Sequence, residues 1–149
     1  MSDVAQPETP VAAVPDSGTE RVALTPAAAE LLVKLTGIHG PLMFHQSGGC
    51  CDGSAPMCYP DGDFKLGGSD VHLGDLTVEG LAPIGFHMSE SQFAYWKHTH
   101  LTVDVTPGRG ASFSLEIPMG VRFLIRSRLF EMDEYESLPP VHKGPLEDA

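Results

Sequence analysis

Glycine and proline recur throughout the chain, with 16 glycines and 13 prolines among its 149 residues. Glycine favours turns and proline removes a backbone hydrogen-bond donor, so both residues interrupt regular structure. Many turns and short elements are therefore expected, and a bundle of long helices is disfavoured. The hydrophobic fraction of 42% is typical of a globular domain, which predicts one modest core.

Both ends of the chain are too polar or too rich in proline to join that core. Residues 1–20 contain Ala, Pro, Ser and acidic residues without an apolar period, which predicts a disordered segment. Residues 131–149 are acidic, contain proline and are aperiodic, which predicts a loose tail. Residues 21–130 are left as a single globular domain.

The central part of the chain contains two helix signals. Thr25 is a preferred N-cap and Pro26 a preferred first helical residue, so a helix begins there and ends near Gly37 or Gly40. Its buried face is predicted from residues that recur at intervals of three and four, namely Ala28, Leu31, Leu32, Leu35 and Ile38. A second, short helix is predicted after Ser89, which begins a capping-box pattern.

Strands are expected where apolar or alternating runs are bounded by turn residues. These runs are 22–24, 42–46, 70–73, 83–88, 98–106, 111–117 and 121–130. The Pro-Gly-Arg-Gly sequence at 107–110 predicts a turn that joins 98–106 to 111–117 as a hairpin. The sequence thus predicts an α+β domain, with a small mixed sheet of about six short strands and two helices.

The charge balance excludes several classes of partner. The formal net charge is -11 with nine basic residues, so neither nucleic acid nor an anionic membrane surface is an expected partner. A protein or a small molecule fits better. The sequence has no run of about 20 apolar residues and no recognisable signal peptide, which predicts a cytoplasmic location.

Three cysteines lie within nine residues, in a glycine-rich loop at 47–58. They are Cys50, Cys51 and Cys58. An odd number of cysteines without an export signal indicates a reducing compartment, where metal binding or thiol chemistry is more common than disulfides. Thiolates bind Zn, Fe, Fe-S clusters and Cu, and the neighbouring glycines let the backbone approach an ion closely.

The cysteine spacing does not complete a metal site on its own. Cys50 and Cys51 are adjacent and Cys58 is distant, so a regular four-cysteine site cannot form within one chain. His98 and His100 share a face of a predicted strand and are candidate ligands. His45 precedes the loop and His87 ends a strand, but single histidines are more often hydrogen-bonded core or surface residues. A homodimer that shares cysteines is the alternative.

Two other interpretations of the loop stay open. One cysteine can be a reactive thiol, either in a Cys50-Cys51 disulfide cycle or with Cys58 as resolving thiol. The loop can also be purely structural, since free cysteine often packs as a small apolar residue. No phosphate-binding loop, dinucleotide fingerprint or nucleophile elbow is present, which leaves catalysis uncertain and favours a role without an enzymatic activity of its own.

A positive stripe is predicted on the last strand, where Arg122, Arg126 and Arg128 share one face. The stripe can receive an acidic partner. The simpler interpretation is that it pairs with acidic residues of its own tail, namely Glu131, Asp133, Glu134 and Glu136.

The run from His45 to Pro60, together with 84–88 and 92–108, resembles a bacterial family of unknown function whose genes often lie beside those of aldehyde dehydrogenases. The resemblance spans roughly residues 22–130. It implies an association with aldehyde metabolism and an aldehyde dehydrogenase as protein partner.

A more distant resemblance is to the HesB-like A-type iron-sulfur carriers. It consists of residues 24–28 before a helix, an apolar strand, and a Ser-Gly-Gly-Cys sequence in which Cys50 matches the loop cysteine of the carriers. Those carriers also use a C-terminal Cys-Gly-Cys, which is missing here. The resemblance implies a HesB-like architecture more than cluster transfer. The resulting hypothesis is a metal-binding accessory protein of an aldehyde dehydrogenase.

Overall fold

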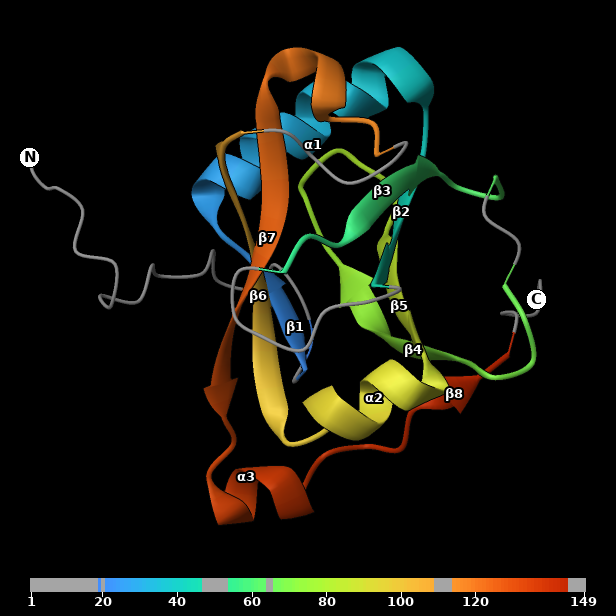
Figure 1. Ribbon diagram of the computed structural model, residues 1–149, viewed down its shortest axis with the longest axis vertical. Coiled ribbons are helices and arrows are strands. Elements are labelled where there is room, and N and C mark those ends of the chain that lie inside the picture. Colours follow the sequence, from blue (N-terminus) through green and yellow to red (C-terminus); the bar gives the residue numbers. More distant parts are fainter. Residues whose placement is uncertain (1–18, 20, 47–53, 64–65, 109–113, 145–149) are drawn as a thin grey trace, which may run out of the picture.

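The computed structural model describes residues 19, 21–46, 54–63, 66–108 and 114–144. Within these residues the chain forms eight strands, three α-helices and one short 3-10 helix (Figure 1). In chain order they are β1 (Val22–Leu24), α1 (Pro26–His39), β2 (Leu42–Gln46), β3 (Met57–Pro60), β4 (Asp70–Leu76), β5 (Ile84–Ser89), α2 (Glu90–Trp96), β6 (Thr99–Pro107), η1 (Ile117–Met119), β7 (Val121–Leu129), α3 (Met132–Glu136) and β8 (His142–Lys143).

The α+β class expected from the sequence is confirmed, but the described strands form two sheets instead of one. The first sheet has the order β1-β6-β7 and the second the order β3-β2-β5-β4-β8. Both contain parallel and antiparallel pairs. The C-terminal segment, expected to be loose, contributes α3 and the edge strand β8. A two-residue strand is too short to leave a period in the sequence.

Helix α1 begins and ends at the residues that the sequence indicates. The Thr25 hydroxyl accepts a hydrogen bond from the N–H of Ala28, and Gly40 ends the helix with a φ of 82°. The expected buried face is found except for Ile38, whose side chain is 63% exposed. Ile38 lies in the last turn of the helix, where the buried face no longer meets the sheet. The predicted second helix is α2, capped by the Ser89 hydroxyl.

The predicted hairpin between 98–106 and 111–117 is wrong. Strand β6 instead pairs antiparallel with β7, in a register that runs from Thr99 opposite Leu129 to Pro107 opposite Val121. Residues 114–116 form no strand, 117–119 form η1, and 111–113 lie outside the described residues. The Pro-Gly-Arg-Gly sequence therefore begins a longer connection, which closes where the Gly108 N–H donates to the Gly120 carbonyl at 3.0 Å.

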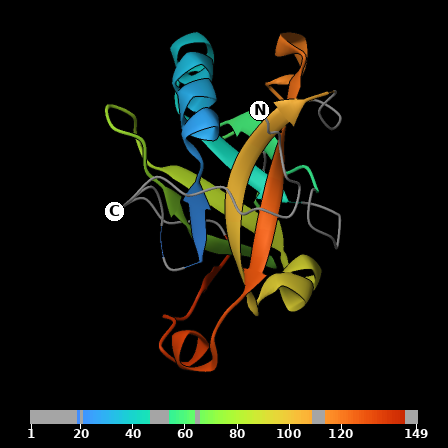
Figure 2. The same cartoon turned by 90° about the vertical axis from the view of Figure 1, so that its left-hand side faces the viewer.

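The core lies between the two sheets and is centred on three phenylalanines. The ring of Phe44 on β2 is 4.9 Å from that of Phe123 on β7, edge to face, and 5.9 Å from that of Phe86 on β5. Helices α1 and α3 lie at opposite ends of the molecule, as the two perpendicular views show (Figure 1, Figure 2). Among the described residues, no helix is long and apolar enough to span a bilayer.

A buried carboxylate connects the edges of the two sheets. Glu116 accepts hydrogen bonds from the Ser114 hydroxyl and from the N–H of Phe123 on β7, the latter at 3.1 Å. Ser114 in turn accepts from the N–H of Cys58 on β3 at 2.8 Å. These side chains take the place of strand pairing between β3 and β7 and satisfy backbone groups that are otherwise buried without partners.

Candidate functional site

Of the three cysteines predicted as ligands, only Cys58 lies within the described residues. Cys50 and Cys51 lie outside the described residues. Cys58 is completely buried on β3, opposite Phe44 in the register, on the face that forms the core. Burial, and next the charge of Glu116, raise the pKa of the Cys58 thiol far above its usual value. Cys58 is therefore protonated at neutral pH and poorly suited to act as a nucleophile or a metal ligand.

The two predicted histidine ligands contact aromatic residues near α3. The ring of His98 lies 4.7 Å from the ring of Tyr135, and the ring of His100 lies 6.3 Å edge-on from that of Phe130. Burial, and next the positive charge of Arg128, lower the pKa of His100. Strand β6 belongs to the three-stranded sheet, whereas Cys58 belongs to the five-stranded sheet. The structure thus does not bring Cys58, His98 and His100 together.

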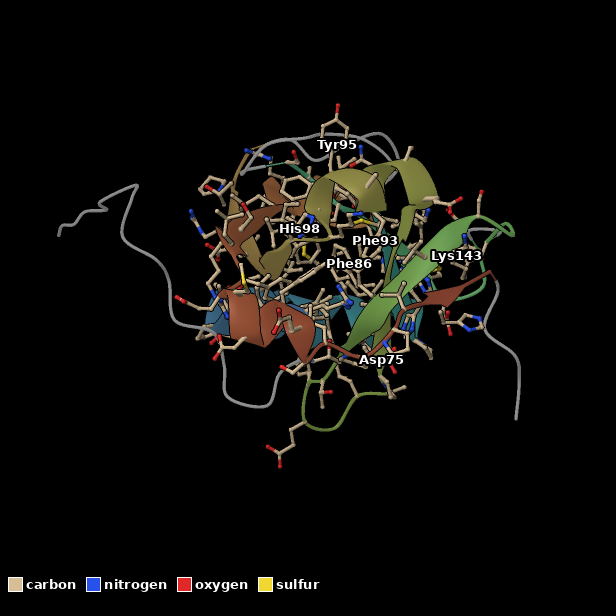
Figure 3. All side chains as sticks on the ribbon, turned by 90° about the horizontal axis from the view of Figure 1, so that it is seen from below. Asp75, Phe86, Phe93, Tyr95, His98 and Lys143 are labelled. Carbon is tan, nitrogen blue, oxygen red and sulfur yellow. The ribbon has the colours of Figure 1, made fainter. Side chains whose placement is uncertain are left out.

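A shallow apolar hollow lies beside α3. Its volume is about 300 Å³, and it is lined by His98, Leu129, Phe130, Met132 and Tyr135. Leu129 and Met132 are 75% and 78% exposed, so the hollow opens to an apolar patch of surface. In Figure 3, His98 lies at this end of the molecule, and Phe86 lies in the interior.

The arginine stripe is partly neutralised by the chain itself. Arg128 donates to both carboxylate oxygens of Glu134, at 3.0 and 2.8 Å, as the simpler interpretation of the sequence predicts. Arg126 pairs instead with Asp104 on the neighbouring strand, with Nε 2.6 Å from Oδ2. Asp104 also accepts from the Thr25 hydroxyl, which connects the start of α1 to the three-stranded sheet.

Four histidines form a continuous row across the five-stranded sheet. His45 on β2 is opposite His87 on β5, His87 is opposite His72 on β4, and His72 is opposite His142 on β8. His45 and His87 each follow a core phenylalanine, so their side chains lie on the outer face of the sheet. We call these four residues the histidine row.

Two members of the row are held by carboxylates. The Nε2 of His45 donates to Oδ1 of Asp70 at 2.9 Å, and the Nε2 of His72 donates to Oδ1 of Asp75 at 2.8 Å. Burial alone raises the pKa of Asp70, but hydrogen bonds from the Gly67 N–H and from His45 lower it overall below its usual value. Asp70 is therefore negatively charged at neutral pH.

The central member, His87, is 3% exposed and has an unused nitrogen. Its Nδ1 is buried and has no hydrogen-bond partner among the described residues. Burial, and then the charges of His72 and His45, lower the pKa of His87 to about 4, so its ring is neutral at pH 7. A buried polar atom without a partner costs about 1–3 kcal/mol, and a bound ligand can recover that cost.

Glycine makes room for the ring of His87. A Cβ atom at Gly85 would lie 2.8 Å from the Nε2 of His87, so the imidazole lies over the bare backbone two residues earlier on β5. No group of three or more His, Cys, Asp or Glu residues in the described part of the chain is already arranged to hold a metal ion. The row can therefore supply part of a ligand set, but not a complete site.

Residues 31–129 match the family model described as a domain of unknown function (DUF779), and because the match covers more than half of the chain, the chain belongs to this family. The sequence-based expectation of a family of unknown function is thereby confirmed. No curated protein and no solved structure matches the chain. The HesB-like architecture and the aldehyde dehydrogenase association stay predictions.

Proposed function

We propose that this DUF779 protein is a metal-binding accessory protein that uses Cys50 and Cys51 as thiolate ligands and acts beside an aldehyde dehydrogenase. The single observation that carries the metal-binding part is the position of the His45–Asp70 pair. His45 is the penultimate residue of β2, and Cys50 and Cys51 follow it by five and six residues in the sequence.

A histidine that binds a metal commonly donates its other ring N–H to a carboxylate, which fixes the ring and makes the imidazole more basic. Asp70 is suited to this role because it is charged at neutral pH and is itself held by the N–H of Gly67 at 2.8 Å. His45 is buried, so its ring has little freedom to turn. A fixed imidazole and two vicinal thiols together match the borderline-soft ligand preference of zinc and similar ions.

Cys58 is not among the proposed ligands. Its thiol lies in the core, on the opposite face of the sheet from the histidine row. Metal binding requires the thiolate, and burial beside Glu116 disfavours that form. His98 and His100 are also left out, because their rings pack against Tyr135 and Phe130.

The metal content of protein purified anaerobically, without an affinity tag, tests the proposal. Stoichiometric metal is expected in the wild type and in Cys58→Ser, and loss of the metal is expected in the double variant Cys50→Ser/Cys51→Ser. Parallel sulfide analysis separates a single ion from an iron-sulfur cluster. Metal-free wild-type protein with intact thiols would overturn the proposal.

The partner half of the proposal rests on the family resemblance. The strongly acidic chain and the apolar hollow beside α3 are compatible with a protein partner. Size-exclusion chromatography of the chain mixed with an aldehyde dehydrogenase from the same organism should show a shared peak. Separate elution at micromolar concentrations of both proteins would contradict a stable physical complex.

A reactive thiol is the second candidate function, and the same His45–Asp70 pair favours it. A histidine oriented by a carboxylate is the usual activator of a neighbouring thiol nucleophile. In that case the alkylation rate of Cys50 or Cys51 should be measured against pH in metal-free protein. Its pH dependence should give an apparent thiol pKa below the ordinary value of about 8.5. An ordinary pKa for both thiols would exclude this candidate.

A further inference from the structure

Two imidazole rings of the histidine row lie at a separation that suits a shared metal ion. The rings of His72 and His87 have centroids 5.0 Å apart and planes inclined by 42°. Two histidines that share a tetrahedral ion at a metal–nitrogen distance of about 2.0 Å have ring centroids about 5 Å apart. The two strands already place the rings at this distance, because the residues are directly opposite each other in the β4–β5 register.

Each of the two rings has a nitrogen that a ligand can use. The Nδ1 of His87 is buried and lacks a hydrogen-bond partner among the described residues. The Nε2 of His72 is occupied by Asp75, which leaves Nδ1 as its coordinating nitrogen. The order carboxylate, histidine, metal is the arrangement by which proteins orient imidazole ligands.

The surroundings of the two rings suit a cation. Asp70 and Asp75, both hydrogen-bonded to members of the row, place negative charge beside the rings. His45 lies directly beyond His87 in the register. The row therefore connects His72 and His87 to the strand that precedes the cysteine loop.

We infer that Nδ1 of His72 and Nδ1 of His87 bind one mononuclear transition-metal ion of the zinc type on the outer face of the five-stranded sheet. The inference rests on the proposed function: Cys50 and Cys51 would supply the thiolates of one tetrahedral ion, His72 and His87 its two nitrogens, and the His45–Asp70 pair would lie beside these four ligands as a positioning pair. Imidazole suits single zinc, copper or iron ions, whereas iron-sulfur clusters are held mainly by cysteine. Asp75 acts as a positioning residue through His72.

Calorimetric titration of the metal-stripped full-length protein with Zn²⁺ tests the inference. His87→Gln and His72→Gln should each weaken Zn²⁺ binding more than tenfold, and Asp75→Asn should weaken it by about tenfold, in the range for loss of an orienting partner. His39→Gln is the matched control, because His39 is an exposed histidine at the end of α1, outside the row. It should bind as the wild type does.

A variant that keeps both imidazoles provides a second test. Gly85→Ala introduces a Cβ within 2.8 Å of the His87 Nε2, so it should displace the ring and weaken Zn²⁺ binding. Thermal unfolding of each metal-free variant verifies folding. If His87→Gln is unfolded, the Asp75→Asn variant still gives the answer, because the side chain of Asp75 is 47% exposed.

The outcomes separate the inference from the proposed function. Wild-type affinity in the His72 and His87 variants, with loss of binding in Cys50→Ser/Cys51→Ser, overturns the inference alone. Loss of binding in the histidine variants but not in the cysteine variant supports the histidine ligands and overturns the proposed cysteine ligands. A wild type that binds no Zn²⁺ overturns both.

Discussion

The Nε2 of His45 donates to Oδ1 of Asp70 at 2.9 Å. His45 lies on β2, the strand that precedes the cysteine loop in the sequence, and Asp70 is the first residue of β4. The register of the five-stranded sheet then places His87 and His72 beside His45. Residues far apart in the sequence thus form one polar cluster, largely buried, on the side of the sheet that does not face the core. The consequences of this arrangement can be measured one residue at a time.

Asp70→Asn should weaken metal binding by about 10- to 100-fold. The substitution removes a negative charge, and the amide of the new side chain orients His45 less strongly than the carboxylate does. The measurement is a competition titration of the metal against a chromophoric chelator at pH 7. Asp61→Asn, in the exposed turn after β3, is the control and should leave the affinity unchanged. Equal affinities for the Asp70 variant and the wild type would show that this carboxylate has no role in the site.

Cys58 should resist alkylation in the folded protein. Its thiol is buried and its pKa is raised, so almost no thiolate is present at neutral pH. Mass spectrometry after iodoacetamide treatment of metal-free protein should find Cys50 and Cys51 modified first, and Cys58 modified only after unfolding in urea. Rapid modification of Cys58 in the native state would mean that the β3 edge opens readily.

Glu116→Ala should destabilise the fold by about 3 kcal/mol, because it leaves the Phe123 N–H and the Ser114 hydroxyl buried without their acceptor. The free energy of unfolding is measured by urea denaturation. Glu79→Ala, at an exposed loop position, serves as the control and should change the stability little. A loss well below 1 kcal/mol for Glu116→Ala would contradict the role assigned to the carboxylate between β3 and β7.

Stability should fall below about pH 6.5 in part because of His100. Burial, and next Arg128, keep its folded-state pKa below the unfolded value of about 6.5, while the charge of Glu134 opposes them. The unfolded chain therefore binds a proton that the folded chain excludes, and stability is lost as the pH falls from the unfolded pKa towards the folded one. His100→Gln should make the unfolding free energy fall less steeply as the pH decreases below about 6.5. An unchanged slope would rule out this histidine as a cause.

Local signals in the sequence predict several elements correctly. Thr25 and Pro26 mark the start of α1, and the apolar run at 42–46 is strand β2. These elements depend on neighbouring residues, so a capping side chain or an apolar period is sufficient to find them. The prediction that Ile38 is buried is wrong, because a helical period does not show where the helix leaves the sheet.

The pairing of strands and the candidate site depend on contacts that are distant in sequence. The β6–β7 pair could not be predicted because the turn sequence at 107–110 favours a nearer partner. His45, His72 and His87 are each unremarkable in the sequence, and only the order of β2, β5 and β4 makes them neighbours. The sequence Phe-His occurs at 44–45 and again at 86–87. This repeated pair is a sequence signal that both histidines lie on the face opposite the core phenylalanines.

X-ray absorption spectroscopy at the edge of the bound metal tests the central claim most directly, on protein purified anaerobically without a tag. A metal held by the cysteine loop and the histidine row should show sulfur neighbours at about 2.3 Å and imidazole nitrogens at about 2.0 Å, with the multiple-scattering features of histidine rings. A shell made only of light oxygen neighbours, or a metal content far below one ion per chain, would contradict the account.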